Sequence, residues 1–335
     1  MNDDRIFTHL VAMSDSRGLF EHAEGTVPRR EHGYCTDDNA RLLTITSLHD
    51  DVGDAHRLSR MALRFVREAQ MSDGSSRNRM NTEGRWTDLP STDDCWGRGL
   101  AGLGNAAAHH DNPTIRKWAM RGFERGARRR SDWPRAMAFA AIGAAEVATV
   151  APPHHEARAL LRATVECIGE LPTNDSWRWP EPRLRYANAT MAEALIAAGS
   201  VLGHASALQR GLEMLGWLVD LETAPGHLSV TGHDGRGPDD VGPQFDQQSI
   251  EVAAMADACW RALMVTSDDA WARGIVAADD WFHGANDVGL PMFDAESSGG
   301  FDGLHADRVN VNEGAESTLA YVTTTYRAAQ LQRVG

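Results

Sequence analysis

Paired acidic residues stand at two places where a helix is expected to begin. Asp37-Asp38 opens one such segment and Asp93-Asp94 opens another. Asp, Asn, Ser and Thr are preferred helix N-caps, and a Glu three residues later completes a capping box, so any single one of these residues is explained by capping. One cap per helix is enough, however. A pair at each of two helix starts therefore suggests carboxylates that converge on one cavity.

Converging carboxylates with different burial can hold different pKa values, so that one is protonated and another ionised at neutral pH. Glycoside hydrolysis needs such a pair: one carboxyl protonates the leaving oxygen and the other activates water or attacks the sugar. We expect Glu316 as the general acid and Asp38 or Asp94 as the base or nucleophile, and the choice between inversion and retention stays open. The candidate catalytic residues are Asp38, Asp94, Asp246 and Glu316.

Further polar and aromatic residues near the expected helix starts are candidates to bind sugar hydroxyls, to orient the acids or to stack on sugar rings. Tryptophan in a polar loop can stack on a sugar, although it can equally cover the end of the core. Glu251 could also serve as a buried partner of Arg98. The candidate binding residues are Asp37, Asn39, Asp93, Trp96, Arg98, Trp133, Trp179, Tyr186, Asn188, Gln247, Glu251, His305 and Glu313.

The loop histidines His32, His227, His233 and His305 leave a second chemistry open, because two histidines could remove and return a proton in a sugar epimerase. Solvated loop histidines are the simpler interpretation. The sequence has no HxH or HExxH spacing, and its four cysteines form no CxxC pair, so we expect no metal and no cofactor.

Two kinds of apolar segment alternate six times along the chain. One kind has an apolar stripe and a charged back, which is typical of a helix with one face in water. The other is apolar or small nearly all round, which indicates a helix buried on several sides. The first kind covers 2–14, 58–69, 112–130, 160–168, 208–219 and 271–282, and the second covers 39–49, 95–108, 136–150, 189–202, 250–264 and 314–329.

This alternation predicts an all-α fold, an (α/α)6 toroid in which six helical hairpins surround one axis. We expect residues 1–335 to form one such domain. An open superhelix of repeats is the alternative, but it would leave one surface of the inner helices exposed to solvent. We favour the closed ring because the inner segments have no polar face. The long connections 71–93, 172–187, 224–245 and 288–312 all precede inner helices, where they could build a polar funnel.

Charge and composition exclude several classes of protein. The net charge is −14, from 47 acidic and 33 basic residues, which argues against a nucleic-acid binder. The basic run 125–130 lies at an expected helix end, where cations suit the helix dipole, so we interpret it as a solvated helix end. No stretch resembles a signal peptide or a membrane span, and we expect a cytoplasmic protein.

Four strings together resemble a bacterial family of the six-hairpin glycosidase-like group, found alone or fused to glycosyltransferase domains. The strings are 33–41 (GYCTDDNAR), 97–98 (GR), 245–251 (FDQQSIE) and 314–318 (GAEST). The sequence departs from that pattern at Ala187, Cys95, Trp96 and Glu313. The resemblance spans about residues 18–321 and implies a toroid with carbohydrate chemistry. Our leading hypothesis is a metal-independent glycoside hydrolase acting on an oligosaccharide or glycoconjugate. A sugar epimerase or isomerase, and a non-catalytic carbohydrate-binding domain, are the alternatives.

Overall fold

A computed structural model describes residues 5–49, 53–172 and 176–334. The chain divides into two compact units, which are described in turn. The first comprises Met1–Cys167 and Val201–Gly203, and the second comprises Ile168–Ser200 and His204–Gly335. Within the described ranges no helix has the length and apolar character required to cross a membrane.

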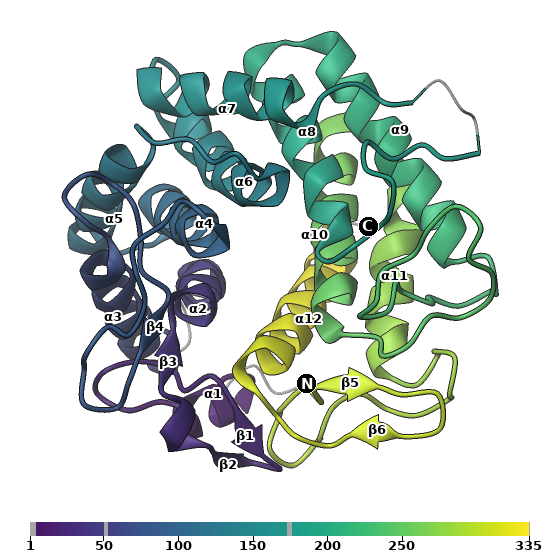
Figure 1. Cartoon of the computed structure of the whole chain (residues 1–335), viewed down its shortest axis with the longest axis horizontal. Helices are drawn as coiled ribbons and strands as arrows, with labels where there is room; N and C mark the ends of the chain where they lie inside the picture. The colour runs from purple at the N-terminus through teal and green to yellow at the C-terminus, as the bar shows by residue number, and fades with distance from the viewer. Residues whose placement is uncertain (1–4, 50–52, 173–175, 335) are drawn as a thin grey trace. The chain divides into compact units, whose positions relative to one another are not determined.

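The first unit is built from helical hairpins (Figure 1). Helices α2, α4 and α6 pack on one another in sequence, while α3 and α5 pack on their outer sides. The helices of this unit are α1 (Thr8–Ala12), α2 (Thr36–Leu48), α3 (Gly53–Ala69), α4 (Asp94–His109), α5 (Pro113–Gly126), α6 (Pro134–Val150) and α7 (His155–Ile168).

Short antiparallel strands hold the connections of this unit in place. Strand β1 (Ala23–Glu24) pairs with β2 (Val27–Pro28), and a 3-10 turn, η2, follows at Arg30–His32. Strand β3 (Tyr34–Cys35) pairs with β4 (Arg79–Met80), with Tyr34 opposite Met80. The second pairing ties the start of α2 to the long connection that precedes α4.

Glycines allow the inner helices of the first unit to approach closely. A Cβ atom on Gly97 would lie 2.2 Å from the carbonyl oxygen of Ala136, and one on Gly104 would lie 2.3 Å from that of Gly143. Both distances are far below van der Waals contact, so only glycine fits at these crossings of α4 and α6. The apolar, alanine-rich face of α6 is buried as a consequence.

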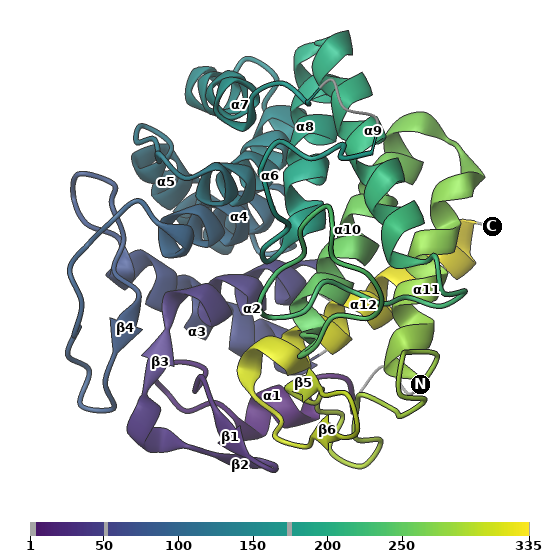
Figure 2. The same ribbon diagram turned by 45° about the vertical axis from the view of Figure 1, so that its right-hand side comes forward.

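The second unit contains α8 (Asn188–Leu202), α9 (Ala205–Glu222), α10 (Ser249–Thr266), α11 (Ala272–Phe282) and α12 (Ala315–Val334). Helix α10 packs against α9, α11 and α12. A 3-10 turn, η3 (Asp269–Trp271), precedes α11, and strands β5 (Gly303–Leu304) and β6 (Val309–Asn310) form a hairpin before α12 (Figure 2). Trp281, Phe282 and Tyr321 lie at the centre of its core.

The twelve α-helices of the described residues occupy the twelve segments that the apolar pattern predicted. The six inner helices begin at Thr36, Asp94, Pro134, Asn188, Ser249 and Ala315, each within three residues of the start of its expected segment. The first segment, 2–14, contains only the short α1, and residues 2–4 lie outside the described part. Residues 173–175 of the connection 172–187 also lie outside it.

Candidate active site

Asp37 and Asp38 are neighbours in the chain, but their carboxylates have different partners. Asp38 is only 3% exposed, accepts a hydrogen bond from the Arg41 guanidinium and accepts another from the Cys35 thiol at 3.0 Å. Asp37 is partly exposed, accepts from the Asn78 side-chain amide at 2.8 Å and lies 3.7 Å from Nε of Arg98. The pair therefore supplies one buried, ion-paired carboxylate and one that reaches the surface.

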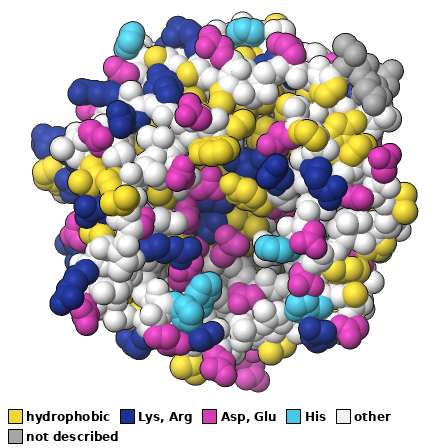
Figure 3. Space-filling model, viewed as in Figure 1, with side chains coloured by type: hydrophobic (Ala, Val, Ile, Leu, Met, Phe, Trp, Pro, Cys, Tyr) yellow, Lys and Arg dark blue, Asp and Glu magenta, His cyan; other side chains and the backbone are white. Residues whose placement is uncertain are grey.

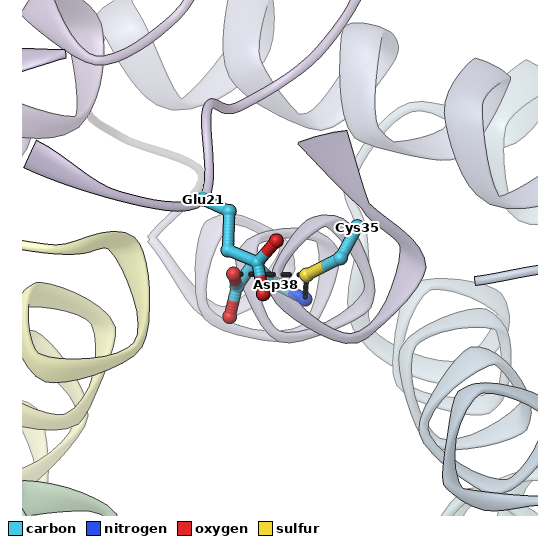
Figure 4. Close-up of side chains that lie close together, drawn as sticks. All are labelled: Glu21, Cys35 and Asp38. Atoms are coloured by element: carbon cyan, nitrogen blue, oxygen red, sulfur yellow. Dashed lines mark hydrogen bonds between the residues drawn. The ribbon is translucent and has the colours of Figure 1, made fainter. Parts of the chain in front are cut away.

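The buried carboxylate belongs to a small cluster with Glu21 and Cys35 (Figure 4). Possible ligand atoms of the three side chains lie within 4.8 Å of one another. However, Glu21 is ion-paired with Arg79, and Asp38 with Arg41. Burial, followed by the charges of Asp38 and Glu21, raises the pKa of the Cys35 thiol well above its ordinary value. A cation would have to displace two guanidinium groups and a thiol proton, so we assign no metal to this cluster.

The second acidic pair lies at the start of α4. Asp93 is exposed and occupies the N-cap position, but its side chain makes no capping hydrogen bond, and Asp94 is half-buried in the first turn. On α2 the N-cap is Cys35, whose sulfur accepts from the backbone N–H of Asp38. Capping therefore does not account for the side chains of Asp37, Asp38 or Asp93.

The thiol of Cys95 lies within electrostatic reach of several acids of the first unit. Burial is the largest cause that raises its pKa, to about 12, and the charge of Asp37 is the next. Asp88, from the connection that precedes α4, and Asp93 raise it further. The charges of acids from α2, from the connection and from the N-cap of α4 thus act on one thiol, while the convergence of the two acidic pairs on one cavity stays a prediction.

Three other candidates of the first unit are buried and hold the local structure. The side chain of Asn39 accepts from the backbone N–H of Leu19 and donates to the carbonyl oxygen of Cys35. The indole N–H of Trp96, 1% exposed, donates to the carbonyl oxygen of Gly126. Arg98 is 8% exposed and stacks over the Phe139 ring at 3.8 Å. The ring of Trp96 therefore covers the end of the core, which was the alternative to sugar stacking, and it cannot stack on a sugar in this position.

Exposure also divides the other aromatic candidates. Trp179 is 0% exposed and stacks on Trp217, so it too belongs to the core. Trp133, which precedes α6, is 63% exposed, and Tyr186, which precedes α8, is 42% exposed. Trp133 and Tyr186 are therefore the aromatic candidates whose rings are open to a ligand.

Asp246 and His305 form a dyad in the second unit. Nδ1 of His305 lies 2.5 Å from a carboxylate oxygen of Asp246, whose side chain is half exposed. Gln247 and Leu304 pair through two backbone hydrogen bonds. This pairing positions the dyad, because Asp246 directly precedes Gln247 and His305 directly follows Leu304. A histidine that donates from Nδ1 leaves Nε2 free as a base or ligand-binding atom.

A second histidine–carboxylate dyad, His227 with Asp287, is held by Gln247, the residue that follows Asp246. The Gln247 side chain is fully buried, accepts from the indole of Trp281 and donates to Asp287 at 2.6 Å. The other oxygen of Asp287 lies 3.0 Å from Nε2 of His227. Sequence reasoning named Gln247 and His227 but missed Asp287, because its position in a turn 40 residues after Gln247 carries no signal of the contact.

Asn188 and Glu251 hold the start of α8. Glu251 is buried and accepts hydrogen bonds from the backbone N–H groups of Ala187 and Asn188. Glu222, 2% exposed, accepts from the backbone N–H and the hydroxyl of Thr231. Burial, together with the charge of Glu251, raises the pKa of Glu222 to about 8. Glu222 is a perturbed carboxyl that the sequence did not single out.

The two acids near the start of α12 have different surroundings. Glu313 is 2% exposed and accepts from the hydroxyl of Ser297 at 2.6 Å. Glu316 is half-buried in the first turn of α12. Of the four candidate catalytic acids, Asp38 is thus buried, Asp94 and Glu316 are half-buried, and Asp246 is half exposed.

No family model and no curated protein matches this sequence. Solved structures match over nearly the whole chain. A D-mannose isomerase matches at 10% identity and a TM-score of 0.67, covering 98% of this chain and 96% of its own. A cellobiose 2-epimerase from Spirochaeta thermophila matches at 11% identity and a TM-score of 0.69, covering 98% and 95%.

A third similar structure is an inactive variant of an α-1,6-mannanase of family GH76 from Salegentibacter, in complex with α-1,6-mannotetrose. It matches at 10% identity and a TM-score of 0.67, covering 98% of both chains. These are six-hairpin glycosidase-like proteins, and the full-length matches show that the chain has the (α/α)6 toroid fold. The (α/α)6 toroid fold that the sequence pattern predicted is confirmed.

Proposed function

We propose that this chain is a carbohydrate-active enzyme, and specifically a glycoside hydrolase that uses carboxylates and no metal. One observation carries this proposal: the Asp37 carboxylate of α2 accepts a hydrogen bond from Asn78 and lies 3.7 Å from Nε of Arg98 on α4, and Asp88 accepts from the backbone N–H of Asn78, so two acids meet beside the start of α4. Their side chains are not used as helix caps. The similar solved structures include a mannanase with a bound mannotetrose, which supports a carbohydrate as the substrate.

Within this proposal Glu316 is the general acid, and Asp94 or Asp38 is the base or nucleophile. Asp37, Arg98 and Asn78 then form an ion-paired and hydrogen-bonded group that can bind sugar hydroxyls beside the reacting carboxylate. Trp133 and Tyr186 are the exposed rings available to stack on a sugar.

The test is product formation from a panel of oligosaccharides and aryl glycosides by wild type, Asp94→Asn and Glu316→Gln. General acid–base groups contribute roughly 10²–10⁴ in rate, so we expect turnover to fall by about 10³ in each variant. Asp54→Asn, an exposed acid on α3, is the matched control and should retain full turnover. Turnover that survives both active-site substitutions would refute the assignment of these acids.

A sugar epimerase or isomerase is the second candidate, and the two histidine–carboxylate dyads favour it. His305 with Asp246 and His227 with Asp287 each present an imidazole whose second nitrogen could accept a proton. Incubation of reducing disaccharides in deuterated water separates the two candidates. An epimerase would incorporate deuterium beside the carbonyl carbon and lose this activity in His305→Gln, whereas a hydrolase would release shorter sugars and incorporate none.

A further inference from the structure

Basic residues are concentrated on α3 and α5, although the chain carries a net charge of −14. Together these two helices hold eight Arg and Lys residues and three acidic ones. Arg57, Arg60, Arg64 and Arg67 follow one another at steps of three or four residues, which places them along one face of α3. Helices α3 and α5 pack against each other, and Figure 3 shows several dark-blue side chains along this margin of the first unit.

Trp118 lies at the centre of this surface. The residue is 38% exposed, and two guanidinium groups lie over its indole ring: that of Arg67, on α3, is 4.4 Å from the ring centroid, and that of Arg121, on α5, is 4.8 Å from it. Cation–π contacts of this kind hold a guanidinium in place without neutralising its charge. The ring therefore fixes two positive charges side by side across a helix pair.

Arg125 adds a third charge, one helical turn after Arg121. Burial, followed by the charges of Arg125 and Arg121, lowers the pKa of Arg67, as expected where like charges lie close together. Among the described residues, no carboxylate lies within ion-pair distance of Arg67, Arg121 or Arg125. By contrast, Arg57 and Arg64 have Asp54 and Glu68 as partners.

We propose that the surface formed by Arg67, Trp118, Arg121 and Arg125 binds an acidic polysaccharide through its carboxylate or sulfate groups. Like charges held together repel one another, and an anion bound between them removes that repulsion. Guanidinium groups match carboxylate and other oxyanions geometrically as well as electrostatically. We name these four residues the Arg–Trp surface.

The shape of the charged region favours a single thin chain over a nucleic-acid duplex. The basic stripe is only two helices wide, and each helix is about 10 Å across. A duplex is a thick rod with one charge per roughly 1.7 Å of its axis, so many of its charges would lie beyond the stripe, on a protein whose net charge is −14. A flexible chain of sugars with spaced charges can follow the stripe alone.

The experiment measures binding directly, without turnover, so it does not depend on the proposed hydrolase activity. Titrations use polygalacturonate for carboxylate groups, heparin for sulfate groups, neutral dextran, and a double-stranded DNA fragment. We expect wild type to bind at least one of the two acidic polysaccharides at low salt, and to bind neither dextran nor DNA.

The variant R67Q/R121Q/R125Q should lose at least tenfold in affinity. The slope of log Kd against log salt should fall by about two, since each charge contact to a single-stranded polyanion contributes about 0.7. The matched control is R85Q/R273Q/R308Q, which removes three exposed arginines that have acidic partners. It changes the net charge equally and should retain binding. Thermal unfolding confirms that both variants are folded.

Trp118→Leu separates positioning from charge. It removes the ring under Arg67 and Arg121 but no charge, so we expect weaker binding with an unchanged salt slope. The proposal is overturned if wild type binds neither acidic polysaccharide, if dextran binds equally, or if the matched control loses as much affinity. Tighter binding of DNA through the same three arginines would overturn the assignment of a polysaccharide.

Discussion

Glu251, on α10, forms two hydrogen bonds with Asn188, the first residue of α8. Its carboxylate accepts from the backbone N–H and from the side-chain amide of Asn188, both at 3.1 Å. A carboxylate at a helix N-terminus satisfies N–H groups that lack an intrahelical partner and suits the helix dipole. Here that carboxylate comes from another helix, so one contact joins α8 to α10 inside the second unit.

Replacing Glu251 by Ala should destabilise the protein by about 1–3 kcal/mol, because buried N–H groups at the start of α8 lose their acceptor. Urea unfolding measures the change. Glu213→Ala, at an exposed position on α9, is the control and should stay within about 0.5 kcal/mol of wild type. Equal stability of Glu251→Ala and wild type would show that the contact is dispensable.

Glu222 should make stability depend on pH. Its pKa is about 8 in the folded protein, against an ordinary value of 4.5. Because the folded-state pKa is raised, the stabilising contribution is fully present below about pH 4.5 and is lost as pH rises towards 8. Glu222→Gln keeps a neutral side chain at every pH, so its Tm advantage over wild type should grow between pH 5 and 8.

Thermal unfolding of wild type and Glu222→Gln across that range measures the effect. Glu83→Gln, at an exposed position, serves as the control and should show a constant difference from wild type. A difference for Glu222→Gln that does not change with pH would mean that this carboxyl is already ionised in the folded protein at pH 5.

Two glycine-to-alanine substitutions on α4 should have opposite effects on the stability of the protein. In Gly104→Ala the new methyl would lie 2.3 Å from the carbonyl oxygen of Gly143, so α4 and α6 must separate, at a cost of about 1–3 kcal/mol. In Gly99→Ala the nearest atom is a Val66 methyl at 3.7 Å. That change should be neutral or stabilise by up to about 1 kcal/mol, because alanine favours helix. Equal effects, measured by urea unfolding, would contradict this packing.

The sequence predicted the helices well because their signal is local and repeated. Apolar residues at helical spacing mark an outer helix such as α3, and the nearly uniform apolar run of α6 marks a buried one. The starts of α4 and α8, at Asp94 and Asn188, lie one residue before the expected segments, because polar side chains directly precede the apolar runs.

The candidate site was predicted less completely, since its contacts join residues far apart in the chain. Spacing led us to expect that acids at the starts of α2 and α4 converge on one cavity, and that convergence stays a prediction. It could not show that Trp96 and Trp179 are buried in the core, because a tryptophan at a helix start or in a connection can face the core or the solvent. It also could not find the contact of Asp287 with Gln247 and His227.

Asp37 and Asp38 should give different results when each is changed to Asn. Asp38 is buried and ion-paired with Arg41, so Asp38→Asn removes one charge of a buried pair and should cost about 1–3 kcal/mol of stability. Asp37 is partly exposed and shared between Arg98 and Asn78, so Asp37→Asn should cost about 1 kcal/mol or less. Urea unfolding of the two variants measures this difference.

If Asp37 contacts the substrate, Asp37→Asn should lower the turnover of the folded protein more than Asp38→Asn does. Under the hydrolase proposal, Asp37→Asn lowers kcat/KM by about tenfold or more through lost hydroxyl binding, because a hydrogen bond to a charged group contributes about 1.5–3 kcal/mol. The loss in Asp38→Asn should be partly recovered at lower temperature, where more of the variant is folded. If Asp37→Asn keeps full turnover while Asp38→Asn remains folded and inactive, then the buried carboxylate is the functional member of the pair.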